Sequence, residues 1–180
     1  MPGVLIIEPQ VFQDERGFFM ETYHQKRYEQ NALDCMFVQD NLSHSILGTL
    51  RGLHYQLKHP QSKLVQVIKG AIFDVTVDIR QGSPSFGQWT GVHISDENRR
   101  QIFVPEGFAH GFCVLSETAD VIYKCTDFYA PDDERGIVWS DPDIGIVWPI
   151  SDPLLSEKDS HYPCLSDVPT GHLPVYEDRK

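Results

Sequence analysis

Three segments of the sequence place ionisable side chains inside otherwise apolar runs. The first contains Arg51 and His54, the second begins with Lys63, and the third is a Pro-Glu-Gly turn followed three residues later by His110. Imidazole can transfer protons near neutral pH, and an ammonium group can stabilise an oxyanion. These residue types are therefore suited to acid–base chemistry on strands that line a cavity.

Each of these side chains also has a simpler interpretation. A lone histidine in an apolar strand is more often a satisfied core residue, and a lysine that opens a strand is usually solvated. Arg51 and Gln56 weaken the first interpretation, because polar neighbours of His54 fit a strand facing either bulk water or a wet pocket. Arg51 and His54 are three residues apart, so an ideal strand would direct them to opposite faces. We expect them to share a site only if Gly52 kinks or bulges the strand.

The elements that must position these residues are predicted to be short strands separated by Gly, Pro, Asn and Asp. In residues 73–79 every odd position is apolar and every even position is polar, which is typical of a strand between the core and water or a cavity. Only His24–Asn31 has the character of a helix of any size. The candidate strands are Val4–Ile7, Phe18–Tyr23, Met36–Asn41, Leu50–Gln56, Lys63–Lys69, Ile72–Ile79, Gln88–Ser95, Gln101–Val104, Gly111–Leu115, Val121–Phe128 and Ile137–Trp139.

The predicted fold is all-β, a double-sheet jelly roll. We expect a single domain over residues 1–180, with an irregular tail from about residue 149 that packs on it. The sequence lacks G-x-G-x-x-G, G-x-x-x-x-G-K-[ST], H-E-x-x-H and G-x-S-x-G. The chemistry must therefore come from scattered polar side chains on strands.

Composition narrows the function classes further. The chain has 180 residues and a net charge of −11, which disfavours nucleic acid or an anionic membrane as a partner. Residues 127–180 carry twelve acids against four bases, so most of the excess lies in the C-terminal part. No apolar run is long enough to span a membrane, and we expect no signal peptide. Four cysteines without C-x-x-C spacing favour reduced thiols and a cytoplasmic location.

The spacing of the second and third segments resembles the cupin superfamily, in which jelly-roll barrels hold a metal through H-x-H, a carboxylate and P-x-G-x-x-H. His54 and His110 occupy the first and last of those positions, but Gln56 replaces the second histidine and Lys63 stands in the carboxylate region. Two imidazoles and an ammonium cannot hold a divalent ion. The resemblance thus implies a cupin without a metal, in which Lys63 is a fixed cation.

A longer series of blocks resembles the dTDP-4-dehydrorhamnose 3,5-epimerase family within that superfamily. The resemblance covers residues 4 to about 160, and its blocks are, in order, Phe12–Glu21, Phe37–Asn41, Leu50–His54, Pro105–Phe112, Tyr123-Lys124 and Ser156–Asp159. The resemblance implies epimerisation of dTDP-4-dehydro-6-deoxy-glucose at C3 and C5, both next to the C4 ketone, through enolates on one oxygen. It implies no cofactor and no metal.

The resemblance also assigns roles to individual residues. It makes His54 the base, Asp159 the carboxylate that orients it, Lys63 the enolate stabiliser and Tyr123 the acid on the opposite face. Lys58, in the loop before Lys63, is a second ammonium that could enter the cavity instead. The implied substrate-binding residues are Phe12, Arg16, Glu21, Gln39, Asn41, Arg51, His110, Tyr129, Glu134 and Lys158.

The resemblance also implies a homodimer in which the N-terminal strands of each subunit cross to the partner. We therefore expect residues 12–21 to complete the neighbouring subunit's site. The alternatives are a mono-epimerase or a 3,4-ketoisomerase on a related nucleotide sugar, because both share the enolate chemistry. A metal-dependent cupin dioxygenase is disfavoured by Gln56 and Lys63. A non-catalytic sugar-binding jelly roll would have no reason to keep His, Lys and Tyr together.

Overall fold

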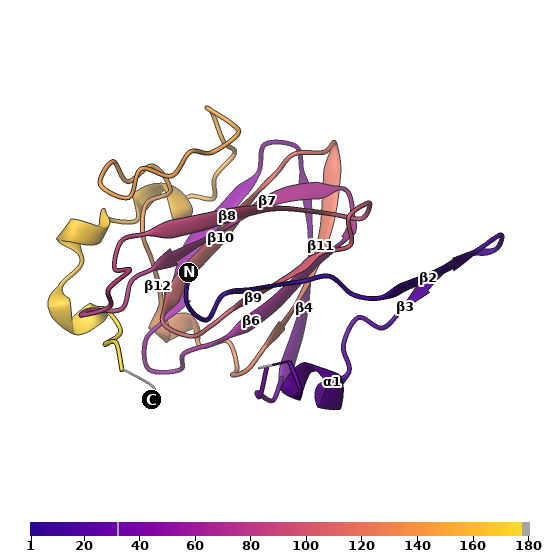
Figure 1. Cartoon of the computed structure of the whole chain (residues 1–180). Coiled ribbons are helices and arrows are strands. Elements are labelled where there is room, and N and C mark those ends of the chain that lie inside the picture. The colour runs from indigo at the N-terminus through magenta and orange to yellow at the C-terminus, as the bar shows by residue number, and fades with distance from the viewer. Residues whose placement is uncertain (32, 178–180) are drawn as a thin grey trace.

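The computed structural model describes residues 1–31 and 33–177, and two antiparallel five-stranded sheets face each other within it (Figure 1). The β4 sheet has the order β1 (Leu5–Ile7), β9 (Gln101–Val104), β6 (Lys63–Lys69), β11 (Thr118–Cys125) and β4 (Gln39–Ile46). The β5 sheet has the order β12 (Glu134–Gly136), β5 (Leu50–Gln56), β10 (Phe108–Val114), β7 (Ala71–Asp78) and β8 (Trp89–Ser95). This arrangement is a jelly roll, and the predicted fold class is confirmed.

The remaining elements are small. A separate hairpin consists of β2 (Val11–Asp14) and β3 (Gly17–Met20), and α1 spans Gln25–Glu29. The C-terminal part contains 3-10 turns in place of longer helices: η1 (Pro131–Asp133), η2 (Asp159–His161), η3 (Leu165–Asp167) and η4 (Thr170–His172). The predicted range of 1–180 also includes Ala32 and residues 178–180, which lie outside the described residues.

Most predicted strands are present, and three have the predicted bounds: Leu50–Gln56, Lys63–Lys69 and Gln101–Val104. The run Ile137–Trp139 is not a strand; β12 ends at Gly136, and Ile137 is apolar because it packs, fully buried, in the core. Residues 36–38 precede β4 rather than opening it. The short strand β2 was not predicted, because three of its four residues are exposed and no buried–exposed alternation marks it.

Apolar side chains form three clusters, one between the two sheets and one on the outer face of each sheet. Val65, Ile102 and Val121 belong to the core between the two sheets. The outer face of the β5 sheet is covered by the C-terminal segment, which places Leu165 and Leu173 against that sheet (Figure 1). A smaller cluster, with α1 nearby, covers part of the outer face of the β4 sheet. The C-terminal segment therefore buries a face that a two-sheet sandwich would leave in water.

The alternating strand β7 is buried on both faces for this reason. Asp74, Thr76 and Asp78 are all fully buried, so the polar positions face the interior rather than bulk water. Asp78 accepts hydrogen bonds from Arg80, Ser83 and Ser85 at the corner that follows the strand. Asp74 reaches His110 on β10. The polar face of β7 thus supplies partners inside the molecule.

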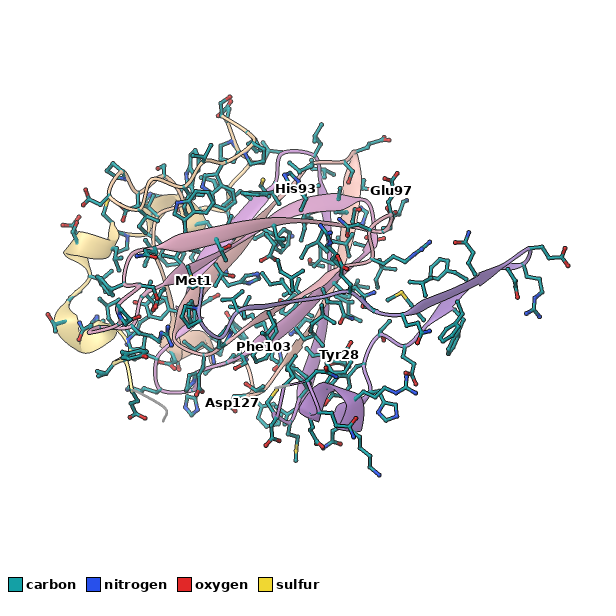
Figure 2. The ribbon with its side chains drawn as sticks, in the orientation of Figure 1. Met1, Tyr28, His93, Glu97, Phe103 and Asp127 are labelled. Atoms are coloured by element: carbon teal, nitrogen blue, oxygen red, sulfur yellow. The ribbon has the colours of Figure 1, made fainter. Side chains whose placement is uncertain are left out.

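The β2–β3 hairpin projects from the body of the molecule, and its side chains extend into open space (Figures 1 and 2). Phe12, Phe18 and Phe19 are each more than half exposed.

Within the described residues no helix is long and apolar enough to cross a membrane.

Candidate active site

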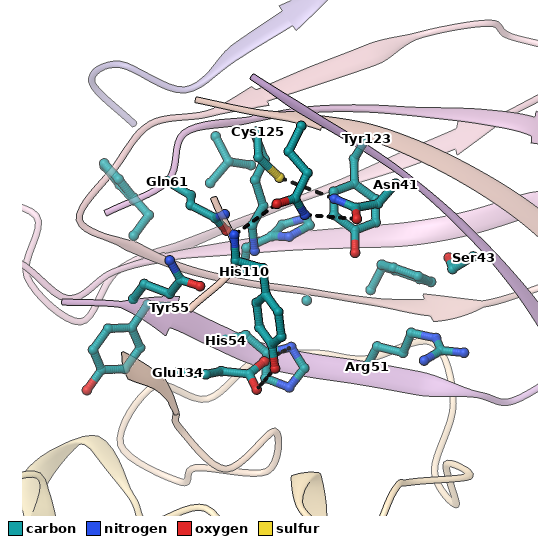
Figure 3. A pocket seen from close by; sticks show the side chains of 18 of the residues that line it. Asn41, Ser43, Arg51, His54, Tyr55, Gln61, His110, Tyr123, Cys125 and Glu134 are labelled. Atoms are coloured by element: carbon teal, nitrogen blue, oxygen red, sulfur yellow. Dashed lines mark hydrogen bonds and ion pairs between the residues drawn. The ribbon is translucent and has the colours of Figure 1, made fainter. Parts of the chain in front are cut away.

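A cavity of about 370 Å³ lies between the two sheets, and its walls carry most of the predicted site residues (Figure 3). Ten of them line it: Gln39, Asn41, Arg51, His54, Lys63, His110, Tyr123, Tyr129, Glu134 and Lys158. Asp159 stands behind His54 and is 3% exposed. Lys58 is exposed at the surface and does not line the cavity, so Lys63 is the lysine that enters it.

The expected irregularity at Gly52 is present and brings Arg51 and His54 to one cavity. His54 pairs with His110, whereas Arg51 pairs with Phe112. Three residues along β5 therefore match two residues along β10, which is a bulge in β5. Gly52 has a φ of 121°, and the peptide bond that follows it is cis. A Cβ at Gly52 would lie 2.6 Å from the Gly111 Cα, so only glycine permits this approach of the strands.

His54 and Asp159 form a hydrogen-bonded pair, with 2.6 Å between Nε2 and Oδ1. Burial acts to raise the pKa of Asp159, but the hydrogen bond and charge of His54 outweigh it and the pKa lies below its ordinary value. An ionised carboxylate only accepts hydrogen bonds, so Nε2 carries the proton. Nδ1, which lies 3.9 Å from Glu134 Oε1, then carries no proton and can accept one.

Lys63 opens β6 and reaches the cavity from the sheet opposite His54. Burial lowers the pKa of its ammonium, and the nearby Cys125 and Glu134 act against that shift. Among residues 1–31 and 33–177, no side chain forms a hydrogen bond or an ion pair with the Lys63 ammonium. A desolvated cation without a protein partner is well suited to an anionic oxygen of a ligand.

Tyr123 lies on β11, paired with Asn41 and Val65 of the neighbouring strands. It therefore belongs to the wall facing the β5 sheet, on the other side of the cavity from His54 (Figure 3). Burial is the main cause that raises the pKa of the Tyr123 phenol, so it carries its proton at neutral pH. A protonated phenol facing an imidazole across one cavity provides an acid and a base for opposite faces of a ligand.

His110 has a carboxylate partner of its own, which sequence reasoning missed. Its Nε2 lies 2.8 Å from Asp74 Oδ2, and both residues are buried. The only available signal was the polar even positions of β7, which place Asp74 on the interior face. His54 and His110 are thus cross-strand neighbours, each with its own aspartate.

The rim of the cavity is tied together by Glu134. Its Oε2 accepts hydrogen bonds from the Tyr129 hydroxyl at 2.9 Å and the Lys158 ammonium at 2.6 Å. Burial acts to raise the pKa of Glu134, but Lys158 and His54 outweigh it and the pKa is lowered. The Tyr129 backbone N–H also donates to Gln39 Oε1. These contacts link the segment around Tyr129 to both sheets.

Gln56 has a structural role at the same rim. Its amide nitrogen donates to the carbonyls of His59 and Phe128, and its oxygen accepts from the Ala130 N–H. It stands where a cupin histidine would bind metal, but its polar atoms are committed to backbone groups. Among the described residues, no group of three or more His, Cys, Asp or Glu is arranged to hold a metal ion.

Three predicted substrate-binding residues do not line the cavity of their own chain. Phe12 and Arg16 lie on the projecting hairpin, where Arg16 is paired with Asp14 and its side chain is 85% exposed. Glu21 follows the hairpin and is paired with Arg27 on α1. The structure thus separates the N-terminal part of the predicted site from the rest.

Comparisons with known proteins agree with one another. A family profile described as dTDP-4-dehydrorhamnose 3,5-epimerase matches residues 1–167. A protein of that name from Shigella flexneri is 58% identical over 161 residues, covering 88% of this chain and 89% of its own.

Two solved structures extend the comparison. The Legionella pneumophila dTDP-6-deoxy-D-glucose-3,5-epimerase, in complex with dTDP-4-keto-L-rhamnose, superposes with a TM-score of 0.95 at 52% identity, covering 97% of this chain and 94% of that one. A 3'-monoepimerase from Streptomyces bikiniensis, in complex with dTDP-quinovose, has a TM-score of 0.89 at 35% identity, covering 97% and 90%.

Proposed function

This chain belongs to the dTDP-4-dehydrorhamnose 3,5-epimerase family, and we infer from this that it is an isomerase of dTDP-L-rhamnose biosynthesis. It converts dTDP-4-dehydro-6-deoxy-D-glucose to dTDP-4-dehydro-L-rhamnose by inverting C3 and C5. The observation that carries the assignment at the site is the His54–Asp159 pair facing Lys63 and Tyr123 across one cavity.

We propose that His54 is the base. C3 and C5 both flank the C4 ketone, so the electron pair of either C–H bond can form a C=C bond while the carbonyl pair moves to oxygen. Nδ1 of His54 takes the proton, since Nε2 is held by Asp159. The ionised Asp159 then stabilises the imidazolium that forms.

Lys63 and Tyr123 complete the proposed reaction. The Lys63 ammonium stabilises the enolate oxygen, which is the same atom for both epimerisations. Tyr123 donates its proton to the opposite face of the ring, because its phenol stands on the wall facing His54. The phenolate recovers a proton, and the imidazolium releases one, by exchange with water.

Substrate recognition follows from the remaining cavity residues. Arg51 offers a guanidinium fork to the diphosphate, and Gln39 and Asn41 present amides from one face of β4. We assign His110, Tyr129, Glu134 and Lys158 to further substrate contacts. Arg51, Lys63 and Lys158 line this one cavity, so a chain with a net charge of −11 can still bind a diphosphate there.

We further propose that two copies exchange their N-terminal hairpins. Phe12, Arg16 and Glu21 do not line the cavity of their own chain, while the hairpin that carries the first two extends away from the body. Leu42 and Ile46 on β4 and Ile68 on β6 are apolar side chains of the β4 sheet that are each more than half exposed. A partner seated on this face would cover them and receive the hairpin at its own cavity.

The exchange can be tested with Arg16→Ala and His54→Ala chains that carry different purification tags. In a mixed dimer with exchanged hairpins, one cavity combines an intact His54 with an intact Arg16 from the other chain. We expect it to show about half of the wild-type turnover at low substrate concentration, well above either parent. A mixed dimer no more active than its parents would contradict the exchange.

A cytoplasmic location is proposed from the thiols. All four cysteines are free, and Cys113 and Cys125 are buried, as is typical of proteins from a reducing compartment.

The activity itself is tested by incubating the purified chain with dTDP-4-dehydro-6-deoxy-D-glucose and identifying the product by NMR. We expect the L-configured 4-keto sugar, inverted at both carbons. A product inverted at C3 alone would instead indicate a mono-epimerase, and unchanged substrate would contradict the assignment.

A further inference from the structure

The aromatic ring of Tyr162 packs against the proposed base, on the same face of the sheet and at its β12 side. Its ring centroid is 5.7 Å from that of His54, and the two planes meet at 72°, an edge-on contact. Tyr162 does not line the cavity, so a ligand there would not touch it.

A glycine makes room for this contact. Gly136 is the residue of β12 that pairs directly with His54 on β5. A Cβ at Gly136 would lie 2.3 Å from the Tyr162 ring, closer than any real contact. The ring therefore occupies the space that a side chain at this position would fill, directly beside the imidazole.

The same short segment supplies two restraints on His54. Asp159 opens η2 and binds Nε2, and Tyr162 follows the end of that turn. The hydrogen bond fixes one edge of the imidazole, and the ring restricts its movement toward β12.

The hydroxyl of Tyr162 takes no part in this arrangement. It is buried and has no hydrogen-bond partner among the described residues. Burial and the nearby carboxylates of Glu134 and Asp159 raise the pKa of the phenol, so it stays neutral and does not exchange protons with His54. What the site uses is the ring.

We propose that Tyr162 is a positioning residue for His54, which holds the imidazole in the orientation that Asp159 selects. The proposal rests on the proposed function in taking His54 as the base. It assigns the contribution to packing rather than to proton transfer or substrate contact.

Steady-state turnover of four variants tests it. Tyr162→Ala is expected to lower kcat by about 10- to 100-fold, since small misplacements of a reacting group have effects of that size. KM should stay within about twofold, because the ring is outside the cavity. Tyr162→Phe should keep wild-type kcat, and Gly136→Ala, which displaces the ring, should lose kcat with Tyr162 intact.

Leu165→Ala is the matched control, since Leu165 is buried in the same C-terminal segment and packs in the apolar core of the β5 sheet. It should unfold at a lower temperature than the wild type, and it should keep the wild-type kcat at temperatures where it is folded. The proposal is overturned if Tyr162→Ala keeps wild-type kcat, or if Tyr162→Phe or Leu165→Ala loses as much as Tyr162→Ala.

A second measurement does not depend on turnover. The proton on His54 Nε2, shielded by its bond to Asp159, should give a slowly exchanging NMR signal in the wild type and in Tyr162→Phe. That signal should disappear in Tyr162→Ala, and its persistence there would overturn the proposal. An inactive wild type that shows this signal pattern would instead contradict the proposed function alone.

Discussion

At the scale of single residues, Lys63 is where folding and activity make opposite demands. Burial lowers the pKa of its ammonium, so the folded state binds that proton less tightly than the unfolded chain does. At neutral pH this costs folding free energy, and the cost disappears only as the pH rises through the unfolded value of about 10.4. The proposed enolate stabiliser is thus a charge that folding alone would not select.

We predict that Lys63→Met unfolds at a higher temperature than the wild type at pH 7. Its kcat should fall by about 100- to 1,000-fold, the usual effect of removing an oxyanion donor. Calorimetry and turnover on the same preparation measure both quantities. Lys58→Met is the control, because Lys58 is exposed and should change neither. A Lys63→Met protein with wild-type kcat would refute the assignment.

The residues found from sequence are those whose type conflicts with their surroundings. His54 and Lys63 are ionisable groups in apolar strands, and such conflicts can be read without a structure. Asp159 was identified only through the family resemblance, since an acid at the start of a turn has no distinctive signal. Asp74 and Tyr162 were missed because their roles depend on which strand or segment the fold places beside them.

At the scale of elements, the bulge in β5 decides whether Arg51 and His54 act together. The register shift between β5 and β10 turns both side chains to one cavity, and it needs a residue without a side chain at position 52. The spacing of the two side chains made an irregularity at Gly52 the condition for their sharing a site. Its partner, the close approach of Gly111, was not predictable, because β10 lies far away in the sequence.

Gly52→Ala should therefore destabilise the fold by at least about 3 kcal/mol, from backbone strain and the clash with Gly111. Gly82→Ala is a matched control: Gly82 has a φ of 83° but open space around its Cβ position, so only strain of about 1–2 kcal/mol applies. Urea unfolding of both variants measures the difference. Equal losses would show that the strand contact is unimportant.

The corner after β7 depends on pH. Burial acts to raise the pKa of Asp78, but hydrogen bonds from Arg80, Ser83 and Ser85 outweigh it and lower the pKa to about 2. Because the folded value lies below the unfolded one, the stabilisation is present above pH 4 and is lost as the pH falls through 2. A shift of this size corresponds to about 2 kcal/mol.

We accordingly expect Asp78→Asn to lose about 2 kcal/mol of unfolding free energy at pH 7. The deficit should shrink steadily below pH 4, because the wild type loses the same contribution there. Denaturant unfolding from pH 7 to pH 2.5 follows this. A deficit that is constant over the whole range would mean that the Asp78 charge contributes nothing.

At the scale of the whole molecule, fold class and enzyme class were predictable, but the assembly of the site was only partly so. Alternating strands and the ordered blocks led to the jelly roll and to the family. The acidic tail suggested an outer surface, yet the C-terminal segment also buries one face of a sheet and delivers Asp159. The hairpin with Arg16 extends beyond its own body, so the binding role proposed for Arg16 requires a second copy.

The most direct test of the proposed enolate mechanism is turnover of dTDP-4-dehydro-6-deoxy-D-glucose in deuterated water, with the position of the label read by NMR. We expect product deuterated at both C3 and C5, because each carbon is reprotonated from a group in exchange with solvent. We expect His54→Asn to incorporate no label above the rate without enzyme. Label introduced at the wild-type rate by His54→Asn, or inversion of either carbon without label, would contradict the mechanism.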